Sequence, residues 1–301
     1  MRKVNVAYNE DCIIGMNRIA NESVDVILTD PPYMYLKNRK LDRNFDEDAF
    51  FVQVNRILKS TGFLVLFGRG ESFYRWNYKL SSLGLKFKEE IIWDKRYPSS
   101  PLQAISRMHE TVAIWTKGCG VLNRVKVDYT EARKYNLDAI IADVKRLRSS
   151  LTSVSQLDEI IKFLDTGVKN TLTKDISDST VTISSKTLGK APRLVSLVDA
   201  LQNGMNERSI ISEVPEKYRS IHPTQKPVRL IERLLNLVAK PGDIIVDPFA
   251  GSFSTAKACI NLGLNYIVFE IDNEYFDLGL NSLESYRENS KSNGTQGILF
   301  G

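Results

Sequence analysis

The stretch VDVILTDPPYMYL, residues 24–36, decides the fold, because an apolar run of strand formers ends abruptly in an acid, two prolines and a tyrosine. Such a continuous apolar run is typical of a strand buried on both faces of a parallel sheet. In open α/β sheets, reactive groups collect beyond the carboxyl ends of the strands, where Asp30 lies. Pro31 and Pro32 lock two φ angles and preset the direction of the Tyr33 ring. The motif therefore predicts a stiff, functional loop.

The residue types in this loop suit one kind of substrate. A carboxylate and a backbone carbonyl can accept two N–H bonds, and an aromatic ring offers a stacking surface. A planar substrate that carries an amino group fits this set, and adenine is such a substrate. Taken alone, the motif also fits an ordinary strand end that binds nothing.

Strands and helices alternate on both sides of this stretch. Besides 23–29, strands are predicted at 3–8, 62–68, 86–93, 109–116, 242–251 and 265–271. Helices are predicted at 12–20, 46–60, 71–84, 228–239, 253–263 and 273–289. This rhythm predicts an α/β fold with a doubly wound, mostly parallel, seven-stranded sheet.

The rhythm stops in the middle of the chain. Amphipathic helices are predicted at 131–151 and 153–165, followed by a Ser/Thr/Lys-rich stretch at 171–190. We therefore expect an inserted, largely helical module. The predicted divisions are one half of the sheet domain at 1–118, the insertion at 119–220 and the second half at 221–301.

A second motif, GDIIVDPFAGSFSTAKACINLG at residues 242–263, is a buried strand, an acid, a small-residue turn and a helix. Such a strand-turn-helix brings backbone N–H groups to a ligand. The next strand ends in Glu270, as expected for an acid that receives the ribose hydroxyls of a nucleoside, with Asp272 as the alternative. A nicotinamide-dependent oxidoreductase is disfavoured, because the chain has no G-x-G-x-x-G pattern.

These motifs resemble those of the β-class amino-methyltransferases of DNA, which transfer a methyl group from S-adenosylmethionine to the exocyclic amine of adenine or cytosine. DPPY at residues 30–33 is similar to their catalytic motif. DPFAGS at 247–252 is similar to their Asp-Pro-Phe-x-Gly-Ser-Gly cofactor motif, and HPTQKP at 222–227 to the segment that precedes the cofactor strand. The catalytic half precedes the cofactor half, as it does in the β class.

The resemblance implies a Rossmann-like methyltransferase fold, S-adenosylmethionine as cofactor and a target-recognition role for the insertion. The implied catalytic residues are Asp30, Pro31, Pro32 and Tyr33. The implied cofactor-binding residues are Asp11, Cys12, Asp30, His222, Thr224, Lys226, Asp247, Pro248, Phe249, Ala250, Gly251, Ser252, Glu270 and Asp272.

Two of these positions leave alternatives open. Asp11 would accept from the amino group of the cofactor's adenine, but an ordinary helix cap accounts for it equally well. Phe253 stands where the family pattern has a second glycine. A large side chain there keeps the backbone away from the ligand unless the ring turns aside.

Double-stranded DNA is the expected partner. The net charge is +5, and residues 117–219 carry 17 Lys or Arg against 13 Asp or Glu. A basic module suits phosphate contacts, although a solvated basic surface is also common. The candidate phosphate contacts are Lys37, Arg39, Lys40, Lys95, Arg96, Lys126, Arg133, Lys134, Arg146, Arg148 and Lys190.

The expected activity is site-specific methylation of adenine N6 in a base turned out of the duplex. The aspartate-led motif favours adenine, since a serine-led form is frequent among cytosine-N4 enzymes. Three alternatives stay open: cytosine N4, an RNA base, and a DNA-binding relative whose catalysis is impaired at Phe253. The resemblance also implies two possible partners, a second copy of the chain in a homodimer and a companion restriction endonuclease.

Cysteine and histidine usage indicates neither disulfides nor a metal site. The three cysteines are far apart, and His109 and His222 lack partners at ligand spacing. The N-terminal residues contain no apolar stretch long enough for a signal peptide or a membrane span. We therefore expect a cytoplasmic protein without membrane contact.

Overall fold

The computed structural model describes residues 3–33, 43–98, 104–134, 136–150, 199–215 and 225–294, without the side chains of 145–150 and 290–294. The chain divides into two compact units. Unit 1 comprises residues 1–123 and 209–301, and unit 2 comprises residues 124–208.

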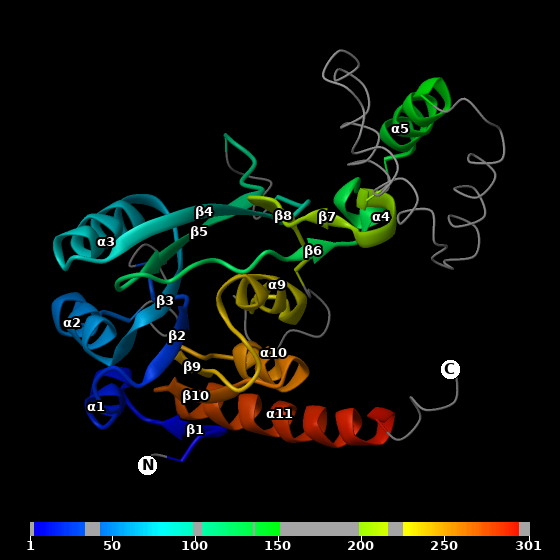
Figure 1. Cartoon of the computed structure of the whole chain (residues 1–301). Coiled ribbons are helices and arrows are strands. Elements are labelled where there is room, and N and C mark those ends of the chain that lie inside the picture. Colours follow the sequence, from blue (N-terminus) through cyan, green and yellow to red (C-terminus); the bar gives the residue numbers. More distant parts are fainter. Residues whose placement is uncertain are drawn as a thin grey trace. The chain divides into compact units, whose positions relative to one another are not determined.

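A mostly parallel sheet forms the centre of unit 1 (Figure 1). Its eight strands in spatial order are β1 (Val6–Asn9), β10 (Asn265–Glu270), β9 (Ile244–Asp247), β2 (Val24–Thr29), β3 (Leu58–Gly68), β5 (His109–Thr116), β4 (Lys86–Asp94) and β8 (Ile210–Ser212). Only β5 runs antiparallel to its two neighbours. The predicted α/β class and the mostly parallel sheet are confirmed.

The predicted number of seven strands is wrong. The eighth strand, β8, comes from the stretch that we predicted to belong to the insertion, and it pairs with β4 in parallel. Its central residue Ile211 is fully buried, whereas Ile210 is half exposed. Three residues are too short for a periodicity signal, so β8 forms because β4 offers it an open edge.

Helices cover both faces of the sheet in unit 1. Figure 1 shows α1 (Cys12–Asn17), α2 (Glu47–Ile57) and α3 (Gly70–Ser82) on one side. On the other side are α9 (Val228–Val238), α10 (Ser254–Leu262) and α11 (Asn273–Gly294). The core under the first group joins Met16, Phe50 and Trp76 to the strand residues Ile27 and Phe269.

Two observed element boundaries differ from the predicted ones for local reasons. The strand predicted at 3–8 begins only at Val6, because Asn5 takes a left-handed φ of 62°. The helix predicted at 46–60 ends at Ile57, and Leu58 already belongs to β3. Lys59 there pairs with Asp25, which β2 carries.

Unit 2 contains a two-stranded antiparallel ribbon of β6 (Lys126–Val127) and β7 (Met205–Asn206). It also contains α4 (Tyr129–Ala132) and α5 (Leu137–Ser150). The prediction of a single helix at 131–151 is wrong, because the structure has two helices there. Lys134, with a left-handed φ of 53°, separates α4 from α5. The helix predicted at 153–165 and the stretch 171–190 lie outside the described residues.

None of the helices in the described part of the chain combines the length and the apolar character that a membrane span requires.

Candidate active site at one edge of the sheet

The two motifs from opposite ends of the chain meet at one edge of the sheet. Strands β2 and β9 are parallel neighbours, with Ile27 opposite Val246. Strand β10 lies on the other side of β9. The carboxyl ends of all three strands therefore point the same way. This places Asp30, Asp247 and Glu270 along one edge.

The loop after β2 is held from three directions. The Tyr33 hydroxyl donates to Asp30 Oδ1. The Ser72 hydroxyl of α3 donates to the Tyr33 carbonyl at 2.8 Å. The Tyr33 ring lies 6.0 Å from the Trp76 ring, centroid to centroid. Pro31 in this loop is buried. The expected stiffness thus comes from contacts as well as from proline.

A buried lysine lies directly against Asp30. Lys226 Nζ donates to Asp30 Oδ2. The same nitrogen is 3.2 Å from Glu110 Oε2, an ion pair without the alignment of a hydrogen bond. The rings of Phe67 and Trp93 lie 5.2 and 5.9 Å from it. Lys226 therefore lies between two carboxylates and two aromatic faces.

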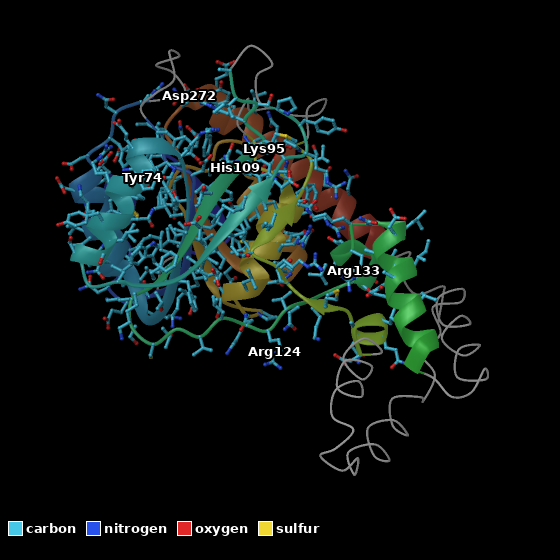
Figure 2. All side chains as sticks on the ribbon, turned by 90° about the horizontal axis from the view of Figure 1, so that it is seen from above. Tyr74, Lys95, His109, Arg124, Arg133 and Asp272 are labelled. Atoms are coloured by element: carbon cyan, nitrogen blue, oxygen red, sulfur yellow. The ribbon has the colours of Figure 1, made fainter. Side chains whose placement is uncertain are left out.

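A second lysine, Lys95, pairs with Glu110, so that acidic and basic side chains alternate from Asp30 to Lys95. Lys95 Nζ forms an ion pair with Glu110 Oε1. Lys95 follows β4 and lies beside His109, which precedes Glu110 on β5 (Figure 2). We did not single out Glu110 from the sequence. The sequence does place Glu110 in a strand of mostly apolar residues, and a carboxylate that is buried in such a strand must be paired.

The pKa values of Asp30, Glu110 and Lys226 are shifted by burial and by their charged neighbours. Burial raises the pKa of Asp30, Glu110 acts in the same direction and Lys226 opposes both. Burial would raise the pKa of Glu110, but Lys226 and Lys95 hold it below its ordinary range. Burial would lower the pKa of Lys226, but Asp30 and Glu110 together raise it. Two carboxylates thus compete for one buried ammonium group.

The turn after β9 is organised by Asp247. The Phe249 N–H donates to Asp247 Oδ1 at 3.1 Å, and the Thr255 hydroxyl donates to Oδ2 at 2.5 Å. Burial raises the pKa of Asp247 to about 7 despite these two bonds, which lower it, and Asp30 and Glu270 contribute to the rise.

Glu270 lies beside this turn at the end of β10. Its Oε2 accepts from the Gly251 N–H at 2.9 Å, and its Oε1 accepts from the Asp272 N–H at 2.8 Å. Asp272 itself caps α11 by accepting from the Glu274 and Tyr275 N–H groups. It also forms an ion pair with Arg43 at 3.1 Å. Glu270 therefore contacts the turn after β9, whereas Asp272 caps α11.

Phe253 does not crowd the turn. It adopts a left-handed φ of 60° just before α10 and is fully buried. Its ring packs edge-on against Phe276 of α11 at 5.7 Å. A Cβ added at Gly279 would lie 3.1 Å from the ring, so this glycine makes room for it. The aromatic side chain therefore packs toward α11.

The structure places some of the remaining cofactor candidates, and others lie outside the described residues. Asp11 caps α1, because its Oδ1 accepts from the Ile13 and Ile14 N–H groups. Cys12 is buried in the core, and burial raises the pKa of its thiol. Ala250 and Ser252 are buried in the turn, as is Pro248. His222 and Thr224 are not among the described residues.

Few of the candidate phosphate contacts can be placed. Lys37, Arg39, Lys40 and Lys190 lie outside the described residues, as do the side chains of Arg146 and Arg148. Arg133 pairs with the buried Asp143 within unit 2, and Tyr129 donates to the same carboxylate at 2.8 Å. Lys126 pairs with Asp199 there. Arg96 is exposed next to Lys95.

This fold and these two motifs at one sheet edge are those of a DNA amino-methyltransferase. A family model described as DNA methylase matches residues 24–281, and the chain therefore belongs to the N6/N4 DNA methylase family. The matched range includes the loop after β2, Lys226, the turn after β9 and Glu270.

Two curated relatives match nearly the whole chain. The chain is 28% identical over 289 residues to the DNA adenine methyltransferase YhdJ of Escherichia coli (strain K12), covering 91% of this chain and 81% of the relative. It is 26% identical over 310 residues to the type II methyltransferase M.HinfI of Haemophilus influenzae, covering 95% and 70%.

Solved structures share the fold at low identity. A complex of M1.HpyAVI with SAM matches with a TM-score of 0.56 and 20% identity, covering 92% of this chain and 98% of that chain. The PvuII DNA methyltransferase, described as cytosine-N4-specific, matches with a TM-score of 0.55 and 14% identity, covering 93% and 86%. The fold alone therefore does not separate adenine from cytosine as the target.

Proposed function

We propose that this protein is a site-specific DNA adenine-N6 methyltransferase that uses S-adenosylmethionine as the methyl donor. The observation that carries the proposal is the Asp30–Tyr33 loop at the same sheet edge as Asp247 and Glu270. The aspartate-led motif and the curated relative that is described as a DNA adenine methyltransferase both favour adenine.

The residues at the carboxyl ends of β9 and β10 fit S-adenosylmethionine. Each oxygen of the Glu270 carboxylate accepts one backbone N–H and keeps a second lone pair for a ribose hydroxyl. Gly251 adopts a φ of 49°, and the Phe253 ring packs toward α11, so the backbone of the turn permits close approach. Bound there, S-adenosylmethionine supplies an electrophilic methyl group.

The loop after β2 prepares the target amine. The exocyclic amine is a poor nucleophile because its lone pair is delocalised into the ring. Hydrogen bonds from its two N–H groups to Asp30 and to the Pro31 carbonyl would favour a pyramidal nitrogen and expose that lone pair. As the methyl group would pass from the sulfonium sulfur, which keeps the electron pair of the broken S–C bond, to the amine nitrogen, one amine proton would leave, and Asp30 is placed to accept it. Most of the rate enhancement then comes from orientation and charge placement.

Tyr33 has two tasks in this proposal. Its ring would stack on the extruded base, which offsets part of the few kcal/mol that unstacking costs. Its hydroxyl already donates to Asp30 and orients the carboxylate.

We further propose that the protein acts on DNA in the cytoplasm. Unit 2 would contribute to sequence recognition, and a homodimer and a companion endonuclease remain predictions.

The proposal is tested by incubating unmethylated genomic DNA with the protein and S-adenosylmethionine and identifying the nucleosides by mass spectrometry. N6-methyladenine in the digest is the expected product. N4-methylcytosine instead would move the target to cytosine, and modification of RNA alone would exclude DNA as the substrate.

The role of Asp30 has a direct test. We expect Asp30→Ala to abolish methyl transfer while calorimetry finds S-adenosylmethionine bound about as tightly as in the wild type. A variant that keeps wild-type turnover would remove Asp30 from the mechanism. If the wild type binds no S-adenosylmethionine at millimolar concentration, the protein is instead a DNA-binding relative without catalysis.

A further inference from the structure

We propose that Lys226 and Glu110 form a buried positioning pair for the reaction, in which Glu110 holds Lys226 against the Asp30 carboxylate. This inference rests on the proposed function of Asp30 and assigns a role to a residue, Glu110, outside both sequence motifs. Neither side chain need touch the substrate.

The geometry that carries the inference is a row of alternating charges. Lys226 Nζ lies against Asp30 on one side and 3.2 Å from Glu110 on the other. Lys95 pairs with the second oxygen of Glu110. The side chain of Lys226 is only 9% exposed, and that of Glu110 is 14% exposed. The two carboxylates and the burial of the side chain therefore restrict the position of the Lys226 ammonium group.

The surroundings explain why the lysine needs two acids. A buried ammonium group costs several kcal/mol of lost hydration unless it is well paired. The rings of Phe67 and Trp93 lie near Lys226 Nζ and replace part of that hydration through cation–π attraction. Glu110 supplies the second negative charge.

The consequence concerns the charge and direction of Asp30. Among the described residues, four titratable groups act on it: Tyr33 on its own loop, Lys226 before α9, Glu110 on β5 and, through charge alone, Asp247 on β9. Of these four, Lys226 is the cation, so it favours the ionised carboxylate by charge. Tyr33 and Lys226 hold separate oxygens of Asp30. The carboxylate plane is therefore set before the target base arrives, which is what orientation catalysis requires.

The test follows the titration of Asp30 itself. Protein labelled with ¹³C at aspartate carboxyl groups is titrated by NMR without cofactor, and Asp30→Asn assigns the signal. Removing the cation in Lys226→Met is expected to raise the pKa of Asp30 by about one unit or more. Removing the anion in Glu110→Gln is expected to lower it, because Lys226 is then left with one carboxylate.

A matched control separates this role from simple support of α9. Glu213 is also 14% exposed, and it pairs with Arg229 and Arg233 of α9 rather than facing Asp30. Glu213→Gln should leave the Asp30 titration unchanged. The double variant Lys226→Met with Glu110→Gln should bring the pKa of Asp30 back toward the wild-type value. It also removes the second acid that Lys226→Met leaves beside Asp30, so it tests the pairing even where Lys226→Met alone does not fold.

Methyl transfer provides the second readout. In Lys226→Met the acid limb of the kcat/KM profile should move to higher pH. Below the new pKa, kcat/KM should fall about tenfold for every pH unit by which the limb moves. In Glu110→Gln the limb should move to lower pH. Identical Asp30 titrations in all variants would overturn the pairing. If the titrations change as expected but the wild type methylates no nucleic acid, the proposed function fails and the ion-pair arrangement stands.

Discussion

Thr255 and Asp247 form a buried hydrogen bond of 2.5 Å between the first turn of α10 and the end of β9. Thr255 is 2% exposed and Asp247 is 5% exposed. This bond ties the helix to the strand at the point where the cofactor turn lies between them. It satisfies one oxygen of a carboxylate that water does not reach.

Replacing Thr255 by valine keeps the shape and removes the donor. We expect the free energy of unfolding to fall by about 1.5–3 kcal/mol at pH 8, where Asp247 is ionised. At pH 5 the carboxyl is protonated and the loss should be only about 1 kcal/mol. Urea denaturation at the two pH values measures both. An equal loss at both would mean that the charge of Asp247 does not matter to this bond.

The stability of the cofactor-free protein should depend on pH through Asp247. Burial raises its pKa from 3.8 to about 7, so the folded state binds its proton more tightly than the unfolded chain. Its contribution to stability is complete below about pH 4 and is lost as the pH rises through 7. The upper bound is about 4 kcal/mol.

The variant Asp247→Asn isolates this effect, because an amide imitates the protonated acid and does not titrate. Urea denaturation between pH 4 and 8 should show the wild type losing stability relative to this variant. Parallel pH profiles for the two proteins would show that folding does not raise the pKa of Asp247.

Phe253→Leu tests whether the aromatic ring obstructs the cofactor turn. The ring fills space between α10 and α11, so the smaller side chain should destabilise the protein by about 1–3 kcal/mol through imperfect packing. Affinity for S-adenosylmethionine should stay within about twofold, because the ring points away from the turn. A variant that binds the cofactor much more tightly would show that Phe253 restricts the site.

Tyr33→Phe and Tyr33→Ala separate the hydroxyl from the ring. Tyr33→Phe keeps the ring beside Trp76 and loses the donor to Asp30, so the acid limb of the pH–rate profile should move to higher pH. Tyr33→Ala should lose much more activity, because base stacking contributes about 1–3 kcal/mol. Equal losses in the two variants would assign the whole effect to the hydroxyl. Fluorescence of a 2-aminopurine target base would report extrusion directly.

Local sequence signals identified the main elements of unit 1 because they are strongly periodic. Apolar runs such as 24–29 and 265–269 predicted buried strands, and the residue types of the Asp-Pro-Pro-Tyr loop indicated a functional site. The predictions that failed depended on a contact with a distant strand or on the backbone conformation of a single residue. β8 depends on the open edge of β4, and the break between α4 and α5 depends on one left-handed residue, Lys134.

By itself, then, the sequence determined the α/β class, the family resemblance and the residue types of the site, because these follow from periodicity and from short motifs. Only the tertiary structure decided which charges meet. Lys226 lies next to a glutamate 116 positions earlier in the chain because β5 and the start of α9 converge near Asp30. It also decided that Phe253 turns toward α11, since the space for its ring is made by Gly279 of another helix. Such pairings depend on distances between elements, which no local pattern contains.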